Sequence, residues 1–117
     1  KESDVIIISA PIYNYGPPAT LKAWSDLAAR AKSTFEYKKD GTRVGLLKDK
    51  HVYLIITSGG TRVGGKEDFL TPWLYHMLNF FGLKKIKTIS ADQMSLNYEK
   101  SIQKAEKKIN QIKRPGQ

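Results

Sequence analysis

Two apolar runs without alternation predict strands in the interior of a sheet. Residues 5–8 (VIII) and 51–57 (HVYLIIT) are rich in β-branched side chains and show no regular polar face. Such runs are typical of parallel strands that are covered by helices on both sides. We therefore expect strands over residues 4–10 and 51–57. A third strand over residues 85–90 carries polar side chains that suit a sheet edge.

Helical spacing of apolar residues separates these strands. The first helix is predicted from about Pro18 to Ala31, after prolines that are tolerated at a helix start. Its expected buried face consists of Leu21, Trp24, Leu27, Ala28 and Ala31. Between this helix and the second strand, residues 33–50 form a long connection, whose length favours a functional loop.

Two further helices complete the pattern. The second is predicted from Thr71, as its amino-terminal cap, to about Phe81, with Gly82 as its carboxyl cap. The third is predicted over residues 99–113, capped by Asn97. Strands that alternate with helices predict an α/β protein with a doubly wound parallel sheet and right-handed crossovers.

Composition narrows the function classes. The 117 residues make one domain, and the absence of cysteine excludes disulfides, thiolate metal sites and a cysteine nucleophile; we expect no metal site. No apolar run is long enough to span a membrane. Residues 1–3 lead directly into a buried strand that needs neighbours. We therefore expect residues 1–117 to be the carboxyl-terminal part of one domain in a longer polypeptide.

The net charge of +9 would suit a polyanionic partner. Much of the excess lies in the last predicted helix, where lysines fill the positions outside the apolar stripe. Because aromatic residues are not interleaved with these lysines, as base stacking requires, we favour a solvated helix face over a nucleic-acid site.

The loop after the first strand is unusual for a solvated connection. Residues 11–18 (PIYNYGPP) combine two tyrosines, an asparagine and three prolines. A stiff aromatic loop at the carboxyl end of a parallel strand suits a planar ligand, since open α/β sheets bind ligands at that edge. The alternative is a proline-rich turn whose tyrosines only cover the sheet.

The loop after the second strand is rich in glycine. Residues 60–66 (GTRVGGK) have the spacing of a phosphate-binding loop, but Glu67 stands where that motif needs serine or threonine to hold magnesium. We therefore interpret this match as fortuitous. Residues 57–60 (TSGG) are either a simple tight turn or a source of close backbone amides and a hydroxyl for the same planar ligand.

Taken together, four segments resemble the flavodoxin-like NAD(P)H quinone reductases and FMN-dependent NADH-azoreductases. These segments are residues 11–15 (PIYNY), 21–24 (LKAW), 30–37 (RAKSTFEY) and 57–60 (TSGG). The resemblance implies a flavodoxin-like five-stranded sheet in the order 2-1-3-4-5, of which this chain holds the third to fifth strands and their helices. The family's FMN phosphate is held after the first strand, outside these residues.

The resemblance also implies roles for individual residues. The expected flavin-binding residues are Pro11, Ile12, Tyr13, Asn14, Tyr15, Thr57, Ser58, Gly59 and Gly60. Phe35 and Tyr37 would line the substrate pocket at the interface of a homodimer. No single residue is expected to be catalytic, because the flavin carries the chemistry.

The implied activity is that of a cytoplasmic oxidoreductase. It would transfer hydride from NAD(P)H to FMN, release the product, and then pass two electrons to a small quinone or azo acceptor. The family's azoreductases carry an arginine before the paired glycines, which is missing after Ser58, so the sequence leaves the acceptor open. A flavodoxin-type FMN electron carrier and a non-catalytic fragment of the fold are the alternatives.

Overall fold

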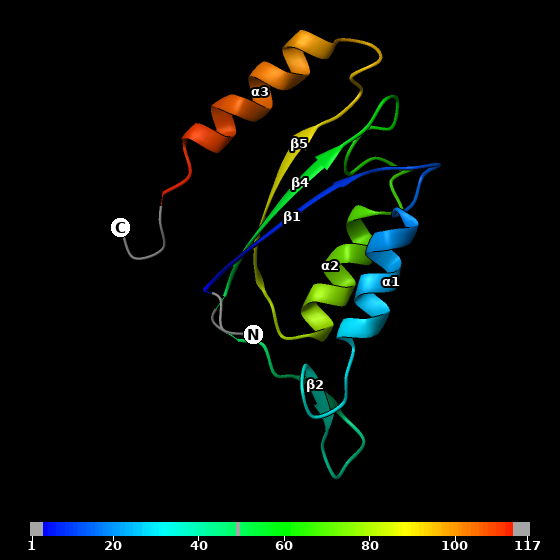
Figure 1. The fold of residues 1–117 in the computed structure, drawn as a ribbon, viewed down its shortest axis with the longest axis vertical. Coiled ribbons are helices and arrows are strands. Elements are labelled where there is room, and N and C mark those ends of the chain that lie inside the picture. Colours follow the sequence, from blue (N-terminus) through cyan, green and yellow to red (C-terminus); the bar gives the residue numbers. More distant parts are fainter. Residues whose placement is uncertain (1–3, 49, 114–117) are drawn as a thin grey trace.

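The computed structural model describes residues 4–48 and 50–113 (Figure 1). Residues 1–3, on which the expectation of a longer chain partly rests, lie outside the described residues. The elements, in chain order, are β1 (Val5–Pro11), α1 (Ala19–Ala28), β2 (Phe35–Tyr37), β3 (Arg43–Gly45), β4 (His51–Thr57), α2 (Thr71–Phe80), β5 (Lys85–Ala91) and α3 (Tyr98–Asn110).

The main sheet is parallel, with its strands in the order β1-β4-β5. Val5 lies opposite His51, and His51 lies opposite Lys85, so the three strands begin at the same level. Parallel strands in sequential order are confirmed, and each predicted strand matches the observed one to within one residue at its ends.

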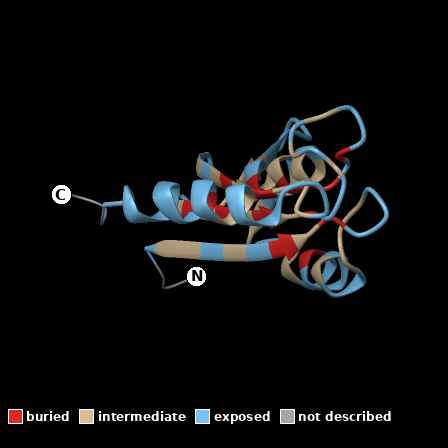
Figure 2. Ribbon diagram, turned by 90° about the horizontal axis from the view of Figure 1, so that it is seen from above, coloured by how far each residue is buried: buried red, intermediate tan, exposed pale blue. Residues whose placement is uncertain are grey.

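Helices cover both faces of this sheet, as expected (Figure 2). In β4, alternate residues Val52, Leu54 and Ile56 are buried in the larger core, to which α1 and α2 contribute. Ile55 points to the other face and packs against the smaller core under α3. Among the described residues nothing covers Ile7 of β1, which is 67% exposed. β1 is therefore buried on one face only, contrary to its unbroken apolar sequence.

Helix α1 is shorter than predicted and buries only part of the expected face, since Leu21 and Ala28 pack against the larger core. Its buried residue is Ser25, whereas Trp24 is 44% and Leu27 77% exposed. The helix ends at Ala28 because the Thr34 hydroxyl donates a hydrogen bond to the Ala28 carbonyl (2.6 Å) and accepts one from the Arg30 amide (3.0 Å). These side-chain bonds replace the next helical turn.

The connection between α1 and β4 holds an antiparallel hairpin, which the sequence analysis missed. Phe35 pairs with Gly45, and Tyr37 with Arg43. Strands of three residues are too short to show an alternating pattern. The one signal available was Asp40-Gly41, a pair typical of hairpin turns. The Asp40 carboxylate accepts a hydrogen bond from the Thr42 amide there, and Gly41 has φ +86°.

Helix α2 starts near the predicted residue but is capped differently. Thr71 was expected to cap it; instead the Asp68 carboxylate accepts hydrogen bonds from the amides of Leu70 (3.0 Å) and Thr71 (2.9 Å). The prediction for Gly82 is confirmed, since this residue follows the helix with φ +97°.

Helix α3 begins one residue before its predicted start and ends three residues before its predicted end. The side chain of Asn97 accepts a hydrogen bond from the Lys100 amide (3.3 Å), which confirms the predicted cap. Ala105 and Ile102 pack on β5, and the lysines occupy exposed positions. Within the described ranges, no helix combines the length and apolar character needed to cross a membrane.

Candidate functional site

The carboxyl ends of β1 and β4 lie side by side, as the sequence predicted. Pro11 is opposite Thr57 in the sheet, and the Ile12 amide donates a hydrogen bond to the Thr57 carbonyl (2.8 Å). The aromatic loop and the glycine loop therefore leave the sheet at the same edge (Figure 1). This edge is where open α/β sheets bind ligands.

A tight turn presents two residues of the aromatic loop. Tyr13 and Gly16 exchange two backbone hydrogen bonds (3.0 and 3.1 Å), and Asn14 and Tyr15 between them have φ +46° and +71°. The left-handed conformation is unfavourable for a tyrosine and costs about 1–3 kcal/mol. The Tyr15 carbonyl accepts a hydrogen bond from the Phe69 amide (2.8 Å), which holds the turn in place.

A cavity of about 770 Å³ lies between this turn and the glycine loop. Its volume falls in the range of small-molecule and cofactor sites. The residues that line it are Ile12, Asn14, Tyr15, Gly60, Thr61, Arg62, Gly65, Lys66, Glu67 and Gln93. Four of the predicted flavin-binding residues, Ile12, Asn14, Tyr15 and Gly60, are thus brought together in one cavity.

The other predicted residues are placed differently. Pro11 and Tyr13 line a separate, smaller hollow of about 320 Å³ beside the start of α1. Thr57, Ser58 and Gly59 form the end of β4 and the beginning of its loop, outside the lining of the larger cavity.

Ser58 holds the loop rather than offering its hydroxyl to a ligand. Its side chain is buried, donates a hydrogen bond to the Thr61 carbonyl and accepts one from the Gln93 amide (3.0 Å). Of the two hydroxyls in residues 57–60, that of Ser58 is therefore already engaged within the protein. The sequence could not show this, because the partner Gln93 lies beyond β5.

Gln93 is a lining residue that the sequence analysis missed. It follows β5 and has φ +52°, so three cavity residues adopt the left-handed conformation that is rare outside glycine. Such strain gathers at functional sites. The parallel order of the sheet was the available signal, since it places the end of β5 beside the end of β4.

The residues that line the cavity offer charged side chains, those of Arg62, Lys66 and Glu67, and also free backbone donors. The amides of Asn14, Tyr15, Gly60, Thr61 and Arg62 have no hydrogen-bond acceptor within residues 4–48 and 50–113. An ideal Cβ on Gly60 would meet no atom within 4 Å. The wall thus combines free N–H groups with open space, which suits a ligand that carries oxygen or nitrogen acceptors on its rim.

The resemblance to a phosphate-binding loop does not extend to the structure. In this loop the Gly64 amide donates to the Asp68 carboxylate (2.9 Å) and the Val63 amide to that of Asp92 (2.8 Å). Helix α2 begins at Thr71 and not at Lys66. The protein's own carboxylates therefore hold amides that a phosphate would need, in agreement with the interpretation of the motif as fortuitous.

We predict that the Asp68 carboxylate stabilises this loop in a pH-dependent way. Burial raises its pKa. The nearby Thr71 hydroxyl and the amides of Thr71, Gly64 and Leu70 lower the pKa by more than burial raises it, although the Thr71 hydroxyl lies outside good hydrogen-bond geometry. The net pKa lies below the ordinary value of 3.8. The stabilisation is therefore complete above that value and is lost as the pH falls through the lower folded-state pKa.

The test is Asp68→Asn in the full-length protein. Asparagine keeps one acceptor oxygen but places an NH₂ group near an amide donor, so the free energy of unfolding at pH 7 should fall by about 1.5 kcal/mol, the value of one charge-assisted hydrogen bond. Urea unfolding at pH 7 and at pH 3 measures this loss, which should shrink at the lower pH. An equal loss at both pH values would contradict the role of the charge.

Phe35 and Tyr37 lie far from the cavity within one chain. They belong to the hairpin at the amino-terminal end of the sheet (Figure 1). There the Phe35 ring packs on that of Phe80, with ring centroids 4.6 Å apart, and Tyr37 is 62% exposed. Their predicted place in a substrate pocket would therefore require a second subunit.

Curated proteins that are similar to this chain carry the same name. The chain is 69% identical over 112 residues to the FMN-dependent NADH:quinone oxidoreductase of Pelagibacter ubique, and 43% identical over 110 residues to the protein of that name in Thiobacillus denitrificans. These matches cover 96% and 94% of this chain, but only 58% and 53% of the relatives. The chain thus spans about half the length of these curated relatives.

A solved structure is also similar to this chain. An FMN-dependent NADH-azoreductase from Bacillus anthracis, in complex with FMN, is 27% identical and superposes with a TM-score of 0.82. The superposition covers 92% of this chain and 53% of the azoreductase. A family model described as a flavodoxin-like fold matches residues 1–114. The parallel β1-β4-β5 sheet and these matches together show that the chain belongs to the flavodoxin-like fold family.

Proposed function

We propose that this chain is part of an FMN-dependent NADH:quinone oxidoreductase. The observation that carries the proposal is the cavity at the carboxyl ends of β1 and β4, lined by free backbone amides and by Ile12, Asn14, Tyr15 and Gly60. The names of the relatives, which share up to 69% of its residues, support the same activity. An azo compound as a second type of acceptor is supported by the azoreductase neighbour.

The residues present fit the isoalloxazine ring of FMN. The pyrimidine rim of this ring carries two carbonyl oxygens and ring nitrogens, which need donors such as the amides of Gly60, Thr61 and Arg62. Ile12 offers an apolar contact, and Tyr15 a flat aromatic face. The absence of a Cβ on Gly60 leaves room for the ring to approach the backbone.

When bound, FMN supplies two-electron hydride chemistry between a nicotinamide and a quinone. The chain's own part is to bind and orient. The Asn14–Tyr15 turn is fixed through Phe69, and the glycine loop is fixed through Ser58 and Gln93, so both walls are preorganised. Fixed amides at the ring rim would favour negative charge there during reduction.

We further propose a ping-pong sequence in which NADH and the acceptor use the same open side of the cavity in turn. No protein acid or base is needed for this sequence. Because NADH is the proposed donor, the proposal also places the enzyme in the cytoplasm, with small molecules rather than nucleic acids or membranes as its partners.

The test uses the full-length protein with FMN. Flavin fluorescence should be quenched on binding, and NADH should be oxidised when a quinone such as menadione is added. Parallel double-reciprocal lines at several quinone concentrations would support the ping-pong sequence. Binding of FMN without NADH oxidation would identify an electron carrier instead, and no binding would identify a non-catalytic member of the fold.

We predict a homodimer from the apolar surface that one chain leaves uncovered. Leu27, Tyr37 and Phe69 are 77%, 62% and 61% exposed. Large apolar side chains that a single chain leaves exposed are candidates for contacts with a second subunit. In a dimer, Phe35 and Tyr37 of one subunit would lie against the cavity of the other. Sedimentation velocity of the full-length protein at micromolar concentration should show a dimer, and a monomer alone would contradict this prediction.

A further inference from the structure

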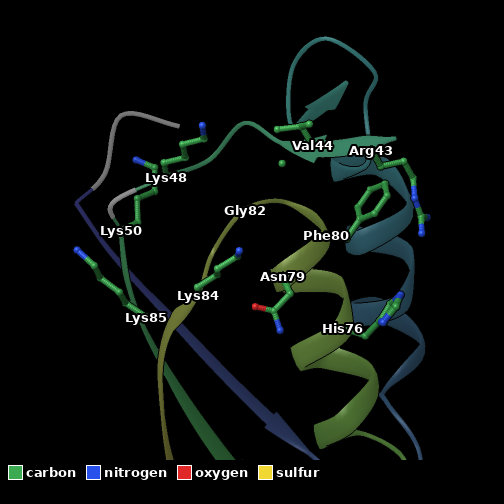
Figure 3. A pocket seen from close by; sticks show the side chains of 11 residues that line it. Arg43, Val44, Lys48, Lys50, His76, Asn79, Phe80, Gly82, Lys84 and Lys85 are labelled. Atoms are coloured by element: carbon green, nitrogen blue, oxygen red, sulfur yellow. The ribbon is translucent and has the colours of Figure 1, made fainter. Parts of the chain in front are cut away.

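A second cavity lies at the opposite end of the sheet from the proposed flavin site. It encloses about 700 Å³ between β3, the last turns of α2 and the beginning of β5 (Figure 3). The strands are parallel, so this cavity faces their amino ends, whereas the first cavity faces their carboxyl ends. The lining residues that matter here are Arg43, Lys48, His76, Asn79, Phe80 and Lys84.

The cavity is strongly basic. Five of its lining side chains, those of Arg43, Lys48, Lys50, Lys84 and Lys85, are cationic, and no carboxylate lines it within the described part of the chain. The side chains of Lys48, Lys84 and Lys85 make no ion pair or hydrogen bond with any described residue. Like charges held together repel one another, so a bound anion would stabilise this arrangement.

The cationic side chains border the cavity from different elements. Lys84 reaches from the start of β5 toward Asn79 on α2, whereas Lys85 points away from them (Figure 3). Beyond the Phe80 ring lies Arg43, whose guanidinium carbon is 5.2 Å from the ring centroid. A guanidinium fixed on an aromatic ring offers a bidentate fork, and lysines add mobile point charges.

The nearby end of α2 does not cancel this positive charge. Helix carbonyls would oppose an anion, but the amides of Gly82 and Leu83 donate to the carbonyls of Asn79 and Leu78 (both 2.9 Å). The Leu47 amide donates to the Phe81 carbonyl (2.8 Å) and ties the hairpin to the helix end. The carbonyls of Leu78, Asn79 and Phe81 are thus satisfied, and these bonds hold the cavity wall in place before any ligand binds.

We propose that this basic cavity binds a diphosphate-bearing ligand of the size of a nucleoside diphosphate. Two adjacent phosphates offer enough oxygens for Lys48 and Lys84, and Arg43 adds positive charge at the far wall of the cavity, beyond Phe80. The cavity volume exceeds what a single inorganic phosphate would fill and leaves room for a nucleoside beside Asn79 and His76. The proposal goes beyond the oxidoreductase function and does not depend on it, because the two cavities lie at opposite ends of the sheet.

Isothermal titration of the full-length protein with ADP, adenosine and pyrophosphate tests this proposal. ADP should bind more tightly than pyrophosphate, and adenosine should not bind. The double variant Lys48→Gln/Lys84→Gln should weaken ADP binding roughly tenfold or more, as expected for the loss of a charge-assisted hydrogen bond. The matched control Lys104→Gln/Lys107→Gln on α3 removes the same charge and should change the affinity by less than about twofold.

Three results would overturn the proposal. Adenosine that binds as tightly as ADP would exclude recognition of phosphate, and equal affinity for pyrophosphate and ADP would exclude a site of nucleotide size. Loss of ADP binding in Gly60→Val, with retention in the Lys48/Lys84 variant, would place ADP in the carboxyl-end cavity. None of these results depends on FMN chemistry, so this proposal and the oxidoreductase proposal fail independently.

Discussion

Replacing Gly45 with alanine should lower the free energy of unfolding by roughly 3 kcal/mol or more. An ideal Cβ at this position would lie 2.1 Å from the Gly82 nitrogen, 2.3 Å from the Phe81 carbonyl carbon and 2.4 Å from the Gly82 Cα. All three are backbone atoms, so no side chain can turn aside to make room. The hairpin would have to leave the end of α2 and break the hydrogen bond between Leu47 and Phe81.

Urea unfolding of the full-length protein measures this loss, with Gly16→Ala as the matched control. A Cβ on Gly16 would meet no atom within 4 Å, and Gly16 is not among the glycines with positive φ. The control should therefore remain within about 0.5 kcal/mol of the original protein, as is usual for surface substitutions. A similar small effect of Gly45→Ala would show that β3 does not pack against the helix end as described.

This close approach also shows what the sequence could not predict. Gly45 lies in the long connection over residues 33–50, for which the sequence predicted no strand, and its partner Gly82 is far along the chain. The strands could be predicted locally, because a run of β-branched residues is itself typical of a buried strand. Helix α3 could be predicted because the cap residue Asn97 and the helical spacing of apolar residues indicate the same start. The hairpin itself carries a local turn signal at Asp40-Gly41, but its docking on the end of α2 depends on contacts between distant segments, which no single stretch encodes.

Helix α1 illustrates a second limit. Of its predicted buried stripe, Leu21 and Ala28 pack on the core beside the buried Ser25, whereas Trp24 and Leu27 are exposed. Periodicity identifies an apolar face but not the surface that covers it. If the proposed homodimer forms, Trp24 and Leu27 become candidates for its interface. Contact with a second subunit would then explain why these exposed positions are apolar.

The sequence predicted where the candidate site lies, at the carboxyl ends of β1 and β4. It did not predict the hydrogen bonds of every residue there. Parallel order alone places the loops after β1 and β4 together, and Asn14, Tyr15 and Gly60 are indeed near one another. The inward role of Ser58 and the contribution of Gln93 follow from hydrogen bonds between the loops after β4 and β5. Such bonds between loops have no pattern in the sequence.

Gly60→Val should weaken FMN binding by the full-length protein roughly thirtyfold, if two amide hydrogen bonds worth about 1 kcal/mol each are lost. Gly60 is not among the glycines with positive φ, and a Cβ there would meet no atom within 4 Å. The new side chain therefore enters the open space of the cavity and not the protein core. We expect the thermal midpoint of the FMN-free protein to stay unchanged while flavin binding is lost.

Loss of FMN binding with an unchanged thermal midpoint would show that Gly60 has a role in binding and not in stability. Asn14→Ala should have a smaller effect, about threefold to tenfold, because it removes at most one hydrogen bond. The control Lys104→Ala/Lys107→Ala on α3 should leave FMN binding unchanged, since α3 packs on β5 away from the cavity. FMN dissociation followed by fluorescence measures all three variants. Normal FMN affinity in Gly60→Val would exclude the glycine loop from the flavin site, because valine at this position fills the space that the ring would need.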